Sequence, residues 1–229
     1  MPFEQDHLQA PRRRWKLTAT VVLVVLNVLA FCFQFTELPK LLDPGYVELS
    51  LWGMQHGYIW QLLTYQFMHA NPMHLILNCW GLYVFGQVVE ATVGKTRFLT
   101  MYFLSGIMGG LLQVLACVQW PRYFEGAVVG ASAGLFGVIA SFALLFPKQP
   151  LVMLVFFVIP VKMRALSLLA LLLIMTGLGI AFPNSKLALL LGKNVAHFAH
   201  LGGILTGLAF TRFYFLRILR ARDLTIEPG

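Results

Sequence analysis

The stretch Gly130-Ala131-Ser132-Ala133-Gly134 leads directly into the apolar residues Leu135-Phe136-Gly137-Val138-Ile139. It places one hydroxyl between small residues at the start of an apolar helix. A hydroxyl in apolar surroundings needs a hydrogen-bond partner or a function. Ser132 is therefore either a polar residue at a helix contact or a nucleophile, and the rest of the sequence has to distinguish the two.

The composition of the whole chain is that of a membrane protein. Of the 229 residues, 59% are hydrophobic and 11% are charged, and the mean hydropathy is +0.76. Soluble domains contain about 25% charged residues, whereas helices that satisfy their own backbone hydrogen bonds can lie in lipid. The net charge of +8 does not favour nucleic-acid binding, because the basic residues lie at the ends of apolar segments. Cys32, Cys79 and Cys117 fall inside apolar runs, which favours packing over a disulfide or a metal site.

Six apolar segments have about the length needed to cross a bilayer. We expect them at residues 17–35, 61–88, 98–118, 131–146, 165–182 and 194–214. The fourth has about 16 residues against the ~20 of a full crossing, so we expect Ser132 to start its helix below the outer surface. A further apolar run at 151–160 is too short to cross, and we place it at the cytoplasmic face because basic residues flank it.

The distribution of basic residues predicts an orientation with both termini in the cytoplasm. Only four of the 17 lysines and arginines then lie outside, namely Lys40, Arg122, Lys186 and Lys193. We therefore predict an all-α polytopic membrane protein with a basic cytoplasmic tail (1–16), a six-helix membrane domain (17–214) and a second basic tail (215–229). We expect no signal peptide, because no small-residue cleavage site follows the first apolar run.

Unusual polar residues share one depth in this topology, the outer halves of the second, fourth and sixth segments. They are His69, His74, Asn78, Ser132, His197 and His200. Ionisable groups inside a bilayer are costly and are functional hypotheses by default. The common depth on three helices is more informative than any one residue.

Helical geometry selects one histidine of the sixth segment. His200 lies about 20° from Gly207 and about 60° from Gly203 around an ideal helix, on a smooth stripe that another helix can approach closely. If that helix carries Ser132, His200 can take the hydroxyl proton during attack on a carbonyl. Phe136 lies beneath Ser132, where its ring could pack on the imidazole. No carboxylate lies in the outer half of a segment, so a catalytic site would be a Ser–His dyad.

These motifs resemble those of the rhomboid intramembrane serine proteases, and the resemblance covers nearly the whole chain. The second segment has the family's histidine–histidine–asparagine pattern, and the sixth has its alanine–histidine and glycine pattern. Trp60 matches a tryptophan of the first loop, but it is followed by Gln61 where arginine is usual. Ala133 follows the serine where many members have glycine, and Phe136 stands where tyrosine is common.

The resemblance implies that Ser132 is the nucleophile and His200 the general base. It also implies an oxyanion hole formed by His74, Asn78 and the Ser132 amide, with Phe136 supporting the imidazole. The substrates would be single-span membrane proteins, cleaved in or near the bilayer without a metal or cofactor. We interpret His69 as a structural residue that holds the first loop.

We accordingly expect a multi-pass protein of a bacterial cytoplasmic (inner) membrane, with the site opening to the extracytoplasmic side. One alternative is a catalytically silent relative that binds membrane-protein clients, against which the presence of both Ser132 and His200 argues. Another is a small transporter, which is disfavoured because the sequence has no internal repeat.

Overall fold

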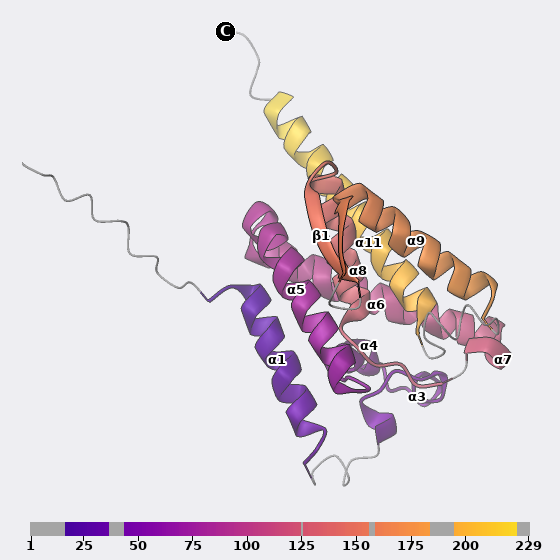
Figure 1. The fold of residues 1–229 in the computed structure, drawn as a ribbon. Coiled ribbons are helices and arrows are strands. Elements are labelled where there is room, and N and C mark those ends of the chain that lie inside the picture. Colours follow the sequence, from indigo (N-terminus) through magenta and orange to yellow (C-terminus); the bar gives the residue numbers. More distant parts are fainter. Residues whose placement is uncertain (1–16, 37–43, 125, 156–158, 184–194, 224–229) are drawn as a thin grey trace, which may run out of the picture.

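The computed structural model describes the chain outside residues 1–16, 37–43, 125, 156–158, 184–194 and 224–229. Figure 1 shows the elements, which run in the order α1 (Ala19–Phe33), η1 (Pro44–Tyr46), α3 (Leu51–Gln55), α4 (Gln61–Thr64), η2 (Tyr65–Phe67), α5 (Pro72–Val93), α6 (Lys95–Gln119), α7 (Pro121–Phe124), α8 (Ser132–Leu145), β1 (Pro150–Val155), β2 (Ile159–Arg164), α9 (Ala165–Ala181) and α11 (His197–Asp223).

Long helices dominate the part of the chain that the structure describes. Each of the six predicted apolar segments contains most of one long helix, namely α1, α5, α6, α8, α9 and α11. By length and composition, α5 and α6 could each cross a membrane, and α1, α8 and α9 are shorter apolar helices. Large apolar side chains also point outward, for example Leu29 on α1 and Leu115 on α6. Such an apolar exterior is what helices present to lipid.

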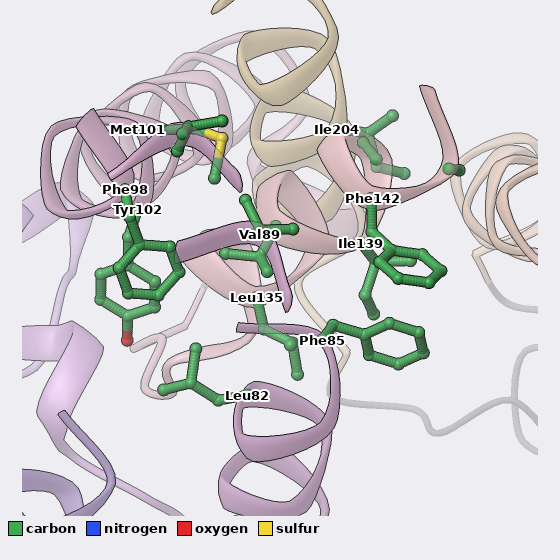
Figure 2. Close-up of a cluster of buried hydrophobic side chains, with 14 of the residues drawn as sticks. Leu82, Phe85, Val89, Phe98, Met101, Tyr102, Leu135, Ile139, Phe142 and Ile204 are labelled. Carbon is green, nitrogen blue, oxygen red and sulfur yellow. The ribbon is translucent and has the colours of Figure 1, made fainter. Parts of the chain in front are cut away.

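The helix that carries Ser132 is the most enclosed of the long helices whose side chains the structure describes. Ten of the 14 residues of α8 are buried, because α5, α6, α9 and α11 all pack against it. Figure 2 shows the resulting cluster, in which Leu135 and Ile139 of α8 meet side chains of α5, α6 and α11. A short helix surrounded in this way holds the residue at its first turn in a fixed place.

The second segment differs from its prediction in where the helix begins. We expected one span over 61–88, but residues 61–67 form the short helices α4 and η2, and α5 begins only at Pro72. Proline suits the first turn of a helix, since its missing N–H has no helical partner there. Asn71 completes the start, with its Oδ1 accepting from the His74 N–H at 2.9 Å. His69 therefore lies in the connection before the helix and not within the helix.

The apolar run after α8 forms an antiparallel β-hairpin, which was not predicted from the sequence. Strands β1 and β2 pair in register, with Leu151 opposite Met163 and Val152 opposite Lys162. Leu151 and Met163 pack against the bundle core. The expectation that this run is too short to cross a membrane agrees with a hairpin of two six-residue strands.

A buried carboxylate fastens α1 to α5. Glu90 accepts hydrogen bonds from the backbone N–H groups of Ala19 (2.7 Å) and Thr20 (2.8 Å) and from the Thr20 hydroxyl (2.8 Å). These N–H groups belong to the first turn of α1, where no helical acceptor exists and where negative charge is favoured. Glu90 therefore acts as a structural cap for a neighbouring helix.

Candidate active site

Ser132 is the first residue of α8, and the backbone that leads into it is tightly held. The Gly130 N–H donates to the Tyr65 carbonyl at 2.9 Å, and Leu49 and Val128 form a short antiparallel bridge. Gly130 has φ +127°, a region that residues with a Cβ rarely adopt. A Cβ there would also lie 2.7 Å from the His74 ring. Glycine at this position is therefore required both by the turn and by the imidazole beside it.

The structure brings Ser132 and His200 together from α8 and α11, although they are 68 residues apart in sequence. His200 Nε2 lies 2.8 Å from Ser132 Oγ, within hydrogen-bond distance. The Phe136 ring stacks on the imidazole at a centroid distance of 4.0 Å and an interplanar angle of 14°. The imidazole is thus fixed on one face by an aromatic ring and at one edge by the hydroxyl.

Glycines on α11 allow this helix to pack closely against α8. A Cβ on Gly203 would collide with the Ala133 carbonyl, and one on Gly207 would collide with the Gly137 carbonyl. The predicted smooth stripe on the sixth segment therefore does face α8. Ala133 is buried, and its methyl group lies against Gly109 of α6, so the departure from glycine is accommodated by a small residue opposite.

The His74 ring lies beside Gly130, at the entrance to α8. Asn78, one turn further along α5, is buried, and its Nδ2 donates to the His74 carbonyl at 3.0 Å. An amide nitrogen has two N–H groups, so this bond leaves a second donor. The N–H groups in the first turn of α8 also lack helical acceptors. The His74 ring and the Ser132 hydroxyl lie on either side of Gly130, since a Cβ built there would be 2.8 Å from His74 Nε2 and 3.6 Å from Ser132 Oγ.

No carboxylate takes part in this arrangement within the described part of the chain. Glu90 is occupied at the start of α1, and none of the described carboxylates hydrogen-bonds to either His200 or His74. Burial in the first loop raises the pKa of Glu48 above its ordinary value. The described site therefore consists of a hydroxyl, two imidazoles and backbone N–H groups, with the Asn78 amide bonded to the His74 carbonyl one turn along α5. Its chemistry matches that of a hydroxyl nucleophile with a neighbouring base.

Comparison with known families identifies the domain that contains these residues. The family model for the Rhomboid domain matches residues 56–217, which include every residue of the site. The chain belongs to the rhomboid family. Members of this family are integral membrane proteins that include proteases, and this explains the apolar exterior of the helices.

Relatives of this rhomboid chain come from bacteria and eukaryotes. Some are named as proteases and one is named as inactive. The chain is 39% identical over 118 residues to the Arabidopsis thaliana protein "Inactive RHOMBOID-like protein 8", a match that covers 48% of this chain and 33% of the relative. It is 26% identical over 211 residues to Rhomboid-like protease 3 of Toxoplasma gondii, covering 87% and 68%. Rhomboid protease GluP of Bacillus subtilis is 27% identical over 197 residues, covering 84% and 34%. The chain thus spans about a third of the length of two of these relatives.

His69 lies outside the Ser132–His200 pair and holds the start of α5 to the end of α1. Its backbone N–H donates to Gln34 Oε1 at 3.0 Å, and its carbonyl accepts from Gln34 Nε2 at 3.3 Å. Its ring meets that of His74 edge to face, with centroids 5.1 Å apart. Gln34 did not figure in the sequence prediction, although a lone glutamine at the end of an apolar segment is a signal for such a contact.

The first loop is braced through Trp60 and Gln61. Trp60 Nε1 donates to the Tyr46 carbonyl at 2.8 Å, and its ring stacks on Tyr58. Gln61 is fully buried, and its amide donates to the Gly45 carbonyl and accepts from the Ser50 N–H at 3.2 Å. A neutral amide thus bonds to the loop backbone at the position where rhomboids usually have arginine. Because Leu49 pairs with Val128, the same loop supports the approach to Ser132.

His197 is the first residue of α11, and its side chain packs against α9. Among the described residues, no hydrogen bond joins it to Ser132. Its ring covers Gly179, where a Cβ would collide with it, and its centroid lies 6.4 Å from that of His200. The choice of His200 over His197 from helical geometry agrees with these positions. His197 joins α9 to the helix that carries the candidate base.

Proposed function

We propose that this rhomboid is an intramembrane serine endopeptidase that hydrolyses peptide bonds in or near the transmembrane segments of single-span proteins. The observation that carries the proposal is the 2.8 Å contact between Ser132 Oγ and His200 Nε2, with the imidazole stacked on Phe136. A serine kept only for helix packing would not need an imidazole nitrogen within reach.

In the proposed reaction, Ser132 Oγ attacks the scissile carbonyl while His200 Nε2 accepts its proton. The new oxyanion is stabilised by the Ser132 N–H and by side-chain donors of His74 and Asn78. His200 then protonates the leaving amine, which departs as the acyl-enzyme forms. Water hydrolyses the ester by the same steps, with His200 again taking and returning the proton. Every bond that breaks is matched by one that forms, and no metal or cofactor is required.

We further propose six membrane spans with both termini in the cytoplasm, flanked by the basic tails at 1–16 and 215–229. The long helices and the excess of lysine and arginine at one end of the segments support this topology. Under it, Ser132 lies in the outer half of the membrane and the site opens to the extracytoplasmic side. A bacterial cytoplasmic membrane suits such a chain, although relatives also occur in eukaryotes.

The test uses purified protein in detergent or liposomes with a model single-span substrate. Ser132→Ala and His200→Ala should each lower turnover by at least ~10³-fold, the scale of losses when a nucleophile or base is removed. A matched control is Ser141→Ala, because Ser141 is a buried serine of the same helix whose partner is Thr211. It should retain turnover. Equal turnover by wild type and Ser132→Ala would refute the proposal.

The second candidate function is a silent relative that binds membrane-protein clients. A relative with "Inactive" in its name favours keeping this candidate. A fluorophosphonate probe separates the two, because it labels an activated serine without needing the natural substrate. Labelling of wild type but not of Ser132→Ala supports the protease. Absence of labelling in both, with clients still bound, supports the silent relative.

A further inference from the structure

The β-hairpin of β1 and β2 has two different faces. Side chains alternate across a strand, so the pair Leu151–Met163, which packs on the core, is followed by the pair Val152–Lys162 on the opposite face. Pro150 and Arg164, also a pair, share that outer face. Val152 is 57% exposed, and Lys162 and Arg164 are exposed as well. The hairpin thus presents apolar and cationic groups side by side.

Two cations of β2 lie on this face and a third lies just before β1, and no described residue provides a counter-ion. Lys148 precedes β1 and is exposed, like Lys162 and Arg164 on β2. The sequence has no aspartate or glutamate between Glu125 and Asp223. Of the carboxylates that the structure describes, none forms a salt bridge with these cations. Among the described residues, an anion from outside the chain would therefore meet no acidic competitor at these cations.

The hairpin is fixed to the start of α9 and to the end of α8. The Ala165 N–H donates to the Gln149 carbonyl at 3.0 Å, and the Leu166 N–H donates to the Pro147 carbonyl at 3.3 Å. Figure 1 shows the hairpin toward the end of the bundle that holds the C-terminal part of α11, away from α3 and α7. The cations are therefore presented on a rigid support at the end of the bundle opposite the first loop.

We propose that the outer face of the hairpin binds the headgroups of anionic phospholipids at the membrane surface. Cations near an anionic bilayer attract its phosphate groups, and exposed apolar side chains among them favour the interfacial zone over water. Val152, Pro150 and Pro160, which are exposed on the same face as Lys162 and Arg164, supply those apolar groups. A soluble acidic peptide or nucleic acid would account for the cations but not for the apolar side chains between them. The inference rests on the membrane location of the family and not on the proposed Ser–His chemistry.

Native mass spectrometry of the full chain in detergent tests the proposal, with phosphatidylglycerol compared against phosphatidylcholine of the same acyl chains. The test variant is Lys148→Gln/Lys162→Gln, which leaves Arg164 at the start of α9. The matched control is Lys95→Gln/Arg122→Gln, which removes the same charge from exposed positions outside the hairpin. A third variant, Lys148→Arg/Lys162→Arg, preserves the charge.

The hairpin variant should bind phosphatidylglycerol about 25-fold more weakly, since each cation near an anionic surface contributes about fivefold. The control and the arginine variant should remain close to wild type, and phosphatidylcholine should bind weakly to all four proteins. Equal losses in the hairpin and control variants would overturn the proposal, as would equal binding of the two lipids by wild type. Binding of a glutamate-rich peptide without binding of phosphatidylglycerol would assign the surface to a protein partner instead.

Discussion

Replacement of Gly130 by alanine tests whether the position of His74 matters for turnover. The added Cβ would lie 2.7 Å from the His74 ring. Ordinary contacts start near 3.4 Å, so the ring must move by about 0.7 Å (3.4 minus 2.7). A misplacement of about 1 Å in a catalytic group can lower the rate ~10²-fold, and loss of an oxyanion donor has a similar cost. Under the proposed function, we expect the Gly130→Ala variant to turn over substrate about 10²-fold more slowly than wild type.

Alanine at a second glycine separates this effect from backbone strain. Gly126 has φ +137° in the same loop, but a Cβ there would meet nothing within 4 Å. Both substitutions place a Cβ in an unfavourable backbone region at a cost of about 1–3 kcal/mol, so thermal unfolding should detect a destabilisation in each. In the cleavage assay, only Gly130→Ala should lose turnover, with Gly126→Ala within about threefold of wild type. Equal turnover by the two variants would refute the argument from the His74 contact.

Three further substitutions test contacts that hold the bundle and the candidate base in place. Glu90→Gln removes charge-assisted bonds to the start of α1 and should lower the free energy of unfolding by about 1.5–3 kcal/mol, measured by chemical denaturation in detergent; an unchanged midpoint would contradict the capping role. Gly179→Ala would push a Cβ into the His197 ring and should lower the thermal midpoint, whereas Gly177→Ala, which meets nothing within 4 Å on the same helix, should not. Phe136→Ala removes the ring stacked under the candidate base and should lower turnover about two- to tenfold, as expected for a contact of ~0.5–1.5 kcal/mol. Phe136→Tyr preserves the ring and should retain turnover, and equal losses in both Phe136 variants would argue against stacking as the cause.

The sequence predicted the contact between the fourth and sixth segments because each contains a strong local pattern. Gly203 and Gly207 leave a stripe without side chains, and their spacing relative to His200 follows directly from helix geometry. A short, apolar fourth segment likewise predicted a helix that begins at Ser132, as it does in the structure. These features depend on residues within one or two helical turns, and such short-range patterns are the most readable in a sequence.

Features that depend on contacts between distant segments were not predictable in the same way. His69 was placed inside a helix because the apolar run around it is continuous, although Pro72 and Asn71 together mark a later start. The hairpin was not predicted because residues 150–160 are all apolar, and only Val161-Lys162-Met163-Arg164 alternates. A continuous apolar run does not by itself distinguish a strand from a helix. The bracing role of Gln61 likewise depends on backbone groups 11 and 16 residues away.

The absence of an orienting carboxylate among the described residues is compatible with the proposed mechanism, because other contacts restrict the imidazole. In serine hydrolases with a triad, the acid holds the ring in position and stabilises the imidazolium. Here the stack on Phe136 fixes the plane of the His200 ring. The contacts of Gly203 and Gly207 with α8 fix the helix from which the ring projects. Packing can therefore orient the His200 ring. It does not, however, supply a negative charge beside the imidazolium. In the proposed reaction that charge comes from the oxyanion itself, which forms next to His200 in the same step in which the imidazole gains its proton.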